Sequence, residues 1–166
     1  MRGPGEGELR PSAPMSDMAI YRLRPTQRKF RSMDKPRNHR YEALWWSIEL
    51  PEEWSVRDYP QCTEFKSINS KGTLQLSGYR QDWDIGEGEL SALAGEEPTT
   101  ESIKLGVFGG LCCSHDSEGT RWKKWWLTKE RTLIFATYSG PVHSADSELA
   151  AVEELLKTLE VRPKLS

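Results

Sequence analysis

Apolar and polar residues alternate along most of the chain after Tyr41, and this period of two is typical of β-strands with one buried face. Residues 45–50 (WWSIEL) predict a first strand, which ends before Pro51 because proline cannot donate a hydrogen bond within a sheet. Residues 62–68 and 73–80 predict two further strands. The NSKG segment between them has the residue types of a tight turn, so we expect a hairpin.

Three consecutive strands are predicted in the second half of the chain, at residues 105–113 (LGVFGGLCC), 121–128 (RWKKWWLT) and 132–138 (TLIFATY). Short polar segments separate them, SHDSEGT and KER, so we expect an antiparallel meander. The last strand is apolar on both faces. It is therefore predicted to be central and covered on each side, with Leu133 in one layer and Ile134 in the other.

The C-terminal part of the chain has the period of an amphipathic helix, which we place at about residues 145–160. Ser144 or Asp146 is expected to cap its start. Glu153 and Lys157 are expected to pair at i,i+4. The helix is predicted to pack on the sheet through one apolar stripe, formed by Leu149, Val152, Leu155, Leu156 and Leu159.

A shorter helix is predicted in the middle of the chain. Residues 86–96 (GEGELSALAGE) allow one or two helical turns, which three glycines weaken, and the polar EPTTES segment follows as a linker. The predicted fold class is therefore α+β: a curved antiparallel sheet covered by a C-terminal amphipathic helix, in a single domain spanning residues 41–163.

Length and composition agree with one domain. The chain has 166 residues, of which 36% are hydrophobic, enough for one core and too few for two domains of ordinary size. No segment approaches the roughly 18 consecutive apolar residues of a membrane span, and the N-terminus lacks the apolar region of a signal peptide. Cys62, Cys112 and Cys113 form no even disulfide framework, so we expect a thiol-reducing, cytoplasmic location.

The charge is distributed unevenly. Residues 1–40 hold 10 Lys/Arg against 4 Asp/Glu, a net charge of +6, whereas residues 41–166 hold 13 against 21, a net charge of −8. Few apolar residues accompany the basic ones, so residues 1–40 are predicted to be a disordered basic arm. The arm could contact RNA, an acidic partner or the acidic domain. Alternatively, it is an extension upstream of a true start at Met15 or Met18.

Residues 111–119 (LCCSHDSEG) contain the residue types of a nucleophilic or metal site. Cys113 and His115 would share one face of a strand, but the sequence supplies no CxxC or HxxxH pair and no evident orienting partner. We therefore expect no catalytic residue, no metal ligand and no cofactor. An enzyme that uses Cys113 and His115 remains a rival hypothesis.

The RWKKWWLT strand poses a question of orientation, because Trp122 and Trp126 lie on one face while Lys123 and Trp125 lie on the other. We expect Trp122 and Trp126 to face inward. Trp125, beside Lys123, is then an exposed partner-binding anchor, since tryptophan is enriched in interface hot spots. The alternative is that other parts of the chain, the arm or the WW pair at 45–46, cover Trp125.

A second group of residues is assigned to partner binding. It consists of Trp83 and the two aspartates beside it, Asp82 and Asp84.

The order of elements, headed by the phrase WSIELPEEW, resembles the PsbP-like fold. That fold is shared by an extrinsic photosystem II subunit, a Ran-binding nuclear import factor and small bacterial proteins of the DcrB and LpqN type. The resemblance covers roughly residues 41–163 and lies in the apolar strand, Pro51, Trp54 and the long final helix. It implies binding of another protein. Related scaffolds serve as type VI secretion effector adaptors and as toxin-immunity proteins, although the short, glycine-broken middle helix departs from the adaptor branch.

Fold alone does not determine function. We expect a non-catalytic bacterial protein that binds another protein, in the first place an immunity protein that masks a cognate toxin. A type VI secretion effector adaptor or chaperone is the alternative, followed by an uncharacterised enzyme and an RNA-associated protein. The acidic domain suits a basic toxin because opposite charges steer the encounter. The same charge repels phosphate, so we expect no nucleic-acid binding by the domain. We also expect no membrane partner.

Overall fold

The computed structural model describes residues 37–95, 97 and 99–163. The predicted disordered arm therefore lies outside the described residues, apart from its last four positions. Two of these, His39 and Arg40, belong to the first strand, so regular structure begins slightly before the predicted boundary at residue 41. Neither helix in the described part of the chain has the length and apolar content needed to span a bilayer.

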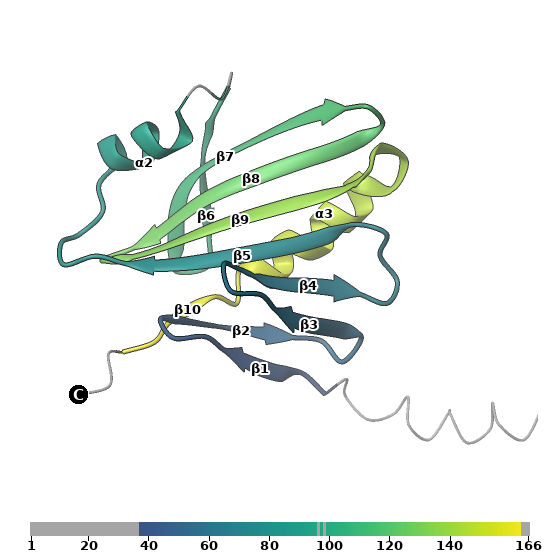
Figure 1. Ribbon diagram of the computed structural model, residues 1–166, viewed down its shortest axis with the longest axis horizontal. Coiled ribbons are helices and arrows are strands. Elements are labelled where there is room, and N and C mark those ends of the chain that lie inside the picture. Colours follow the sequence, from purple (N-terminus) through teal and green to yellow (C-terminus); the bar gives the residue numbers. More distant parts are fainter. Residues whose placement is uncertain (1–36, 96, 98, 164–166) are drawn as a thin grey trace, which may run out of the picture. The chain divides into compact units, whose positions relative to one another are not determined.

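The described strands form two antiparallel sheets (Figure 1). The larger sheet has the order β3-β4-β5-β9-β8-β7-β6, with β3 (Trp54–Asp58), β4 (Thr63–Ser67), β5 (Thr73–Arg80), β6 (Glu101–Leu105), β7 (Phe108–Ser117), β8 (Thr120–Lys129) and β9 (Thr132–Pro141). The smaller sheet has the order β1-β2-β10, with β1 (His39–Glu42), β2 (Trp46–Leu50) and β10 (Glu160–Val161). The helices are α2 (Glu87–Ala94) and α3 (Val142–Leu156).

The two faces of the larger sheet are buried by different elements. The inner face packs against α3 and the small sheet, while the outer face carries α2 over β7 and β8. The inner core is the larger one and includes Ile48, Leu74, Leu76, Phe65, Leu127, Val152 and Leu156. The outer core contains Ile85, Leu90, Ala94, Cys113, Trp126 and Leu133. The predicted α+β class, an antiparallel sheet covered by a C-terminal helix, is confirmed.

The central strand and the two predicted connections agree with the sequence pattern. β9 lies between β5 and β8 and is covered on both faces, with Leu133 in the outer core and Ile134 in the inner core. β4 and β5 pair antiparallel as the predicted hairpin. Figure 1 shows β7, β8 and β9 running side by side as the predicted meander, whose register the backbone pairs define.

The segment preceding β8 differs from the prediction. LGVFGGLCC is not one strand, because the chain turns at Gly106 between β6 and β7. Gly106 has a φ of 63°, and a Cβ there would lie 2.2 Å from the backbone oxygen of Lys157, so only glycine fits. The SHDS residues are the end of strand β7 rather than a loop. The turn to β8 is two residues long, with positive φ at Glu118 (51°) and Gly119 (80°).

The start of α3 also differs from the prediction. β9 ends at Pro141 and the helix begins directly at Val142, three residues before the predicted start. The first turn has no side-chain cap, so Ser144 and Asp146 do not have the predicted capping role. The helix ends at Leu156, and the chain then enters β10, which the sequence did not predict.

The acidic residues of α3 connect it to other elements. Glu153 accepts a hydrogen bond from Lys123 of β8 at 2.6 Å, while Lys157 pairs with Glu154 instead of the predicted Glu153. Since Glu153 lies on the side of the helix that faces β8, its carboxylate neutralises a lysine on the inner face of the sheet.

The predicted orientation of β8 is wrong. Trp125 is completely buried (0% exposed) in the inner core, and Trp126 is 6% exposed in the outer core. Both faces of the strand are covered, so neither tryptophan is free. Lys123 is accommodated on the inner face because Glu153 pairs with it and its ammonium lies 5.5 Å from the centre of the Trp125 ring. Trp125 is therefore not available as an exposed anchor.

Candidate binding surface

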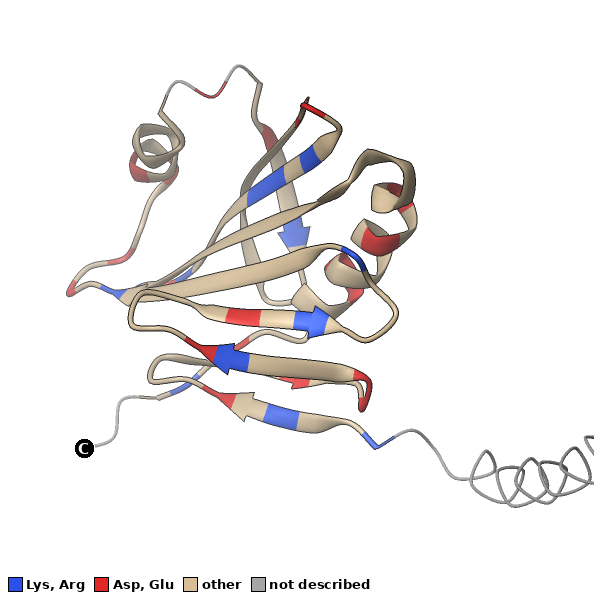
Figure 2. Cartoon of the chain, turned by 45° about the vertical axis from the view of Figure 1, so that its right-hand side comes forward, with Lys and Arg blue, Asp and Glu red and all other residues tan. Residues whose placement is uncertain are grey.

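Residues 81–95, which we call the acidic segment, join β5 to the end of α2. They contain four Asp/Glu and no Lys or Arg, a net charge of −4 over 15 residues. Figure 2 shows these acidic residues on α2 and in the loop before it. The loop residues Asp82, Trp83 and Asp84 are all exposed. The residues of the second group assigned to partner binding are therefore accessible to solvent, and their role in binding stays a prediction.

The exposed tryptophan of this loop is held in a defined position. Trp83 is 58% exposed, and its indole N–H donates to the Glu89 carboxylate at 3.1 Å. Ile85 and Leu90 are buried in the outer core and fix the segment to the sheet. The Ile85 N–H also donates to the backbone oxygen of Glu130 at 2.9 Å. An aromatic ring that is exposed yet fixed loses little conformational freedom when a partner covers it.

A groove lies beside the C-terminal turn of α2, over the outer faces of β5, β8 and β9. It has a volume of about 630 Å³ and is lined by Tyr79, Arg80, Gln81, Leu93, Ala94, Glu97, Lys124, Trp126, Leu133 and Phe135. We call it the α2 groove. Trp126 and Phe135 form an aromatic pair in its wall, with ring centres 5.5 Å apart. Tyr79 and Leu93 are half-exposed.

The polar groups of the α2 groove are unevenly paired. Lys124 donates a hydrogen bond to Glu97, which lowers the pKa of that carboxyl. Arg80 has no carboxylate within salt-bridge distance among the described residues, and its Nη1 is buried without a hydrogen-bond partner. Its guanidinium lies 5.3 Å from the centre of the Trp45 ring, which packs on the inner core, so the Arg80 side chain points away from the groove, to the same face of β5 as Leu76. The Oε1 atom of Gln81 is likewise buried without a partner.

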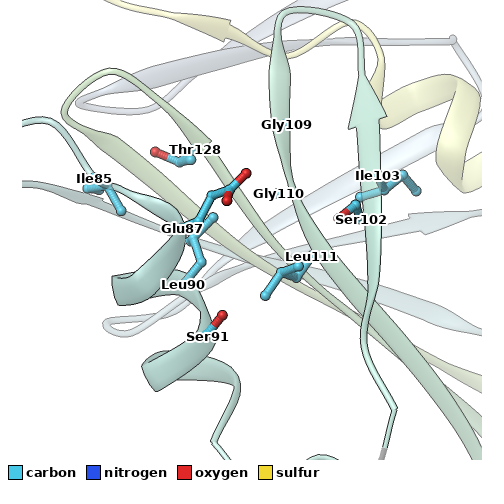
Figure 3. A pocket seen from close by; sticks show the side chains of 10 residues that line it. All are labelled: Ile85, Glu87, Leu90, Ser91, Ser102, Ile103, Gly109, Gly110, Leu111 and Thr128. Atoms are coloured by element: carbon cyan, nitrogen blue, oxygen red, sulfur yellow. The ribbon is translucent and has the colours of Figure 1, made fainter.

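A second hollow, of about 460 Å³, lies between α2 and the β6–β7 hairpin (Figure 3). Leu90 and Leu111 contribute apolar side chains from opposite sides. Glu87 is the one ionisable residue among those that line it. A single carboxylate with no second titratable group beside it does not make an acid–base pair.

The cysteine-rich strand β7 was the sequence's candidate for chemistry. Burial raises the pKa of the Cys112 thiol, and burial together with the negative charge of Glu97 raises the pKa of the Cys113 thiol. These shifts are opposite in direction to those of a reactive thiolate. His115 is exposed near the end of the strand. Within the described residues, no group of three or more His, Cys, Asp or Glu is placed to hold a metal ion.

Sequence reasoning missed the α2 groove, although part of its signal was present. Leu74 and Leu76 face the inner core, so alternation along β5 places Tyr79 on the outer face. The same rule places Trp126 opposite Trp125. What the sequence lacked was the position of α2, which brings Leu93 next to these strands.

Comparison with models of known protein families gave no match, and no curated protein sequence matched either. Among solved structures, a crystal structure from Bacteroides thetaiotaomicron VPI-5482 aligns with 75% of this chain, with a TM-score of 0.61 and 17% identity. This chain spans about half the length of that protein, 48%. The solution structure of cyanobacterial PsbP (CyanoP) from Synechocystis sp. PCC 6803 aligns with 78% of this chain and 95% of its own length, with a TM-score of 0.44 and 12% identity.

At such identities the similarity to the Bacteroides protein concerns the fold alone. We rest the α+β class on the sheets, register and helices of this chain, and the relation to the DcrB- and LpqN-like bacterial branch stays a prediction.

Proposed function

We propose that this domain is a non-catalytic bacterial protein-binding domain of the toxin-immunity type, which acts in the cytoplasm. Its partner is a basic protein, and the binding surface is the acidic segment with Trp83 as its central anchor. The observation that carries the proposal is an exposed tryptophan, fixed by Glu89, within 15 residues that carry a net charge of −4. This replaces Trp125, whose burial removes it from any binding surface.

The charge and the aromatic ring have separate roles in this proposal. The carboxylates of Asp82, Asp84 and Glu87 are exposed and attract a basic surface, which raises the association rate at low salt. Trp83 provides buried apolar area once the partner covers it, and this slows dissociation. Asp84 has one described cation nearby, since its carboxylate lies 3.8 Å from Arg131.

The proposal is tested by growth rescue. The full chain is co-expressed with the toxin encoded beside its gene, in cells that the toxin alone arrests. We expect the wild-type chain to restore growth and the double variant Asp82→Asn/Asp84→Asn to restore it less well. Lys104→Gln, a change of similar size on exposed β6, serves as the matched control and should act like the wild type. Persistent arrest in the presence of folded wild-type chain would contradict the proposal.

A further inference from the structure

The α2 groove offers a ligand aromatic side chains but no free charge. Trp126 and Phe135 form an aromatic pair in its wall, with ring planes inclined by 39°, and half-exposed Tyr79 adds a third ring. The two oppositely charged side chains that line the groove, Lys124 and Glu97, form an ion pair with each other. A charged ligand would either break this pair or stay unpaired against an apolar wall, and both are unfavourable.

One polar group of the α2 groove has no partner. Arg80 points to the inner core, so alternation along the chain places the next side chain, Gln81, among the lining residues of the groove on the outer side. The Oε1 atom of Gln81 is buried and accepts no hydrogen bond from the described residues, which is unfavourable for an amide oxygen. The terminal torsion of a glutamine side chain is broad, so the amide turns at low cost and presents Oε1 to a donor in the groove. The groove is thus suited to a ligand with one hydrogen-bond donor.

We propose that the α2 groove binds a small uncharged aromatic alcohol, a fused or single ring of the phenol type. The ring packs against Trp126, Phe135 and Tyr79, where contacts between aromatic rings add to the burial of apolar area. The hydroxyl group of the ligand donates a hydrogen bond to Oε1 of Gln81. A volume of about 630 Å³ is within the range of small-molecule sites, roughly 300–1,000 Å³. The inference goes beyond the proposed function and does not rest on it, because no carboxylate of the acidic segment takes part.

Calorimetric titration of the full chain at neutral pH with three probes tests the proposal. The probes are 2-naphthol, its saturated counterpart decahydro-2-naphthol, and 2-naphthoate, which carries a negative charge. We expect one 2-naphthol to bind per chain. The saturated probe should bind about three-fold or more weakly, because the contacts between aromatic rings are lost. The charged probe should bind about ten-fold or more weakly, because its charge finds no free partner. Absence of saturable 2-naphthol binding, or equal or tighter binding of either other probe, would overturn the proposal.

Two pairs of variants locate the site. Gln81→Leu removes the acceptor at similar size and should weaken the binding of 2-naphthol about three-fold or more. Gln75→Leu, a change on β5 outside the groove, should leave the affinity unchanged. Leu93→Asp places a carboxylate at the edge of the groove, where Leu93 is 50% exposed, and should weaken binding about ten-fold. Ile68→Asp, at a position that is 82% exposed between β4 and β5, is its control.

Thermal unfolding of each variant establishes that it is folded. If folded Gln81→Leu or folded Leu93→Asp binds 2-naphthol as tightly as the wild type does, the ligand is not held as proposed.

Discussion

At the scale of single residues, Glu148 of α3 forms the densest polar contact in the described part of the domain. Its carboxylate accepts hydrogen bonds from the Tyr138 hydroxyl at 2.7 Å, the Ser70 hydroxyl at 2.8 Å, and the backbone N–H groups of Gly72 at 2.8 Å and Lys71 at 3.0 Å. Burial alone would raise the pKa of Glu148, but the hydrogen bonds to the carboxylate have the larger, opposite effect, and the pKa is lowered to about 2. The contact ties α3 to the turn of the β4–β5 hairpin and depends on the ionised carboxylate.

This contact makes stability dependent on pH. The ordinary pKa of the group is 4.5 and its folded pKa is about 2, so its contribution is complete above pH 4.5 and is lost as pH falls toward 2. We expect Glu148→Gln to destabilise the fold by about 2 kcal/mol at pH 7, the scale of hydrogen bonds to a charged group, and by clearly less at pH 3. Urea unfolding at both pH values measures this, with exposed Glu154→Gln as control. An equal effect at both pH values would show that the charge of Glu148 is irrelevant.

The tryptophans of β8 give a second prediction at this scale. Trp125→Ala removes a completely buried ring and should cost about 3–5 kcal/mol. Trp122→Ala should lower the free energy of unfolding much less, because Trp122 is 38% exposed. Denaturant midpoints of the two variants measure the difference. Similar midpoints would mean that the two faces of β8 are not buried as described.

At the scale of elements, α2 is the least firmly held helix of the described domain. It has eight residues and no side-chain cap, and two of its residues are buried. Gly88 lies within its first turn, and a Cβ added there meets no atom within 4 Å. Helix propensity thus favours alanine, and Gly88→Ala should stabilise the domain by about 0.5–1 kcal/mol. Thermal unfolding measures this effect.

Gly110 of β7 is the contrasting case for the same substitution. A Cβ at Gly110 would lie 1.8 Å from the backbone oxygen of Trp126 in the neighbouring strand. The pairing of β7 with β8 must then open, so Gly110→Ala should destabilise the domain by about 1–3 kcal/mol. If the two alanine variants shifted the unfolding midpoint in the same direction, either the exposure of α2 or the β7–β8 register would be wrong.

Prediction from the sequence succeeded where one physical signal dominated. The apolar run around Ile134 identified the central strand, and the NSKG turn identified the hairpin. It failed at β8, because Trp125 and Trp126 give both faces of the strand similar apolar content and the covering elements decide between them. Prediction from the sequence also missed β10, since a strand of two residues is too short to show an alternation of apolar and polar positions. The exposure of Trp83 depends on how α2 docks, which local patterns do not encode.

At the scale of the domain, the acidic segment and the inner core are separate parts of the structure. The acidic segment lies around Trp83, and the α2 groove, in which Lys124 and Glu97 pair with each other, lies beside the C-terminal turn of α2. The large inner core holds the fold together without contributing to the acidic segment. Changes at the exposed residues of the acidic segment should therefore affect binding with little effect on stability, while changes in the inner core should do the reverse.

The measurement that tests the central claim most directly is the affinity of the chain for the toxin encoded beside its gene, determined by calorimetry for three forms. Wild type is compared with Trp83→Ala and with Trp122→Ala, a matched replacement of another exposed tryptophan. We predict that Trp83→Ala raises the Kd about 30-fold or more, which equals about 2 kcal/mol, and that Trp122→Ala leaves it unchanged. A folded Trp83→Ala variant that binds as tightly as the wild type would contradict the account.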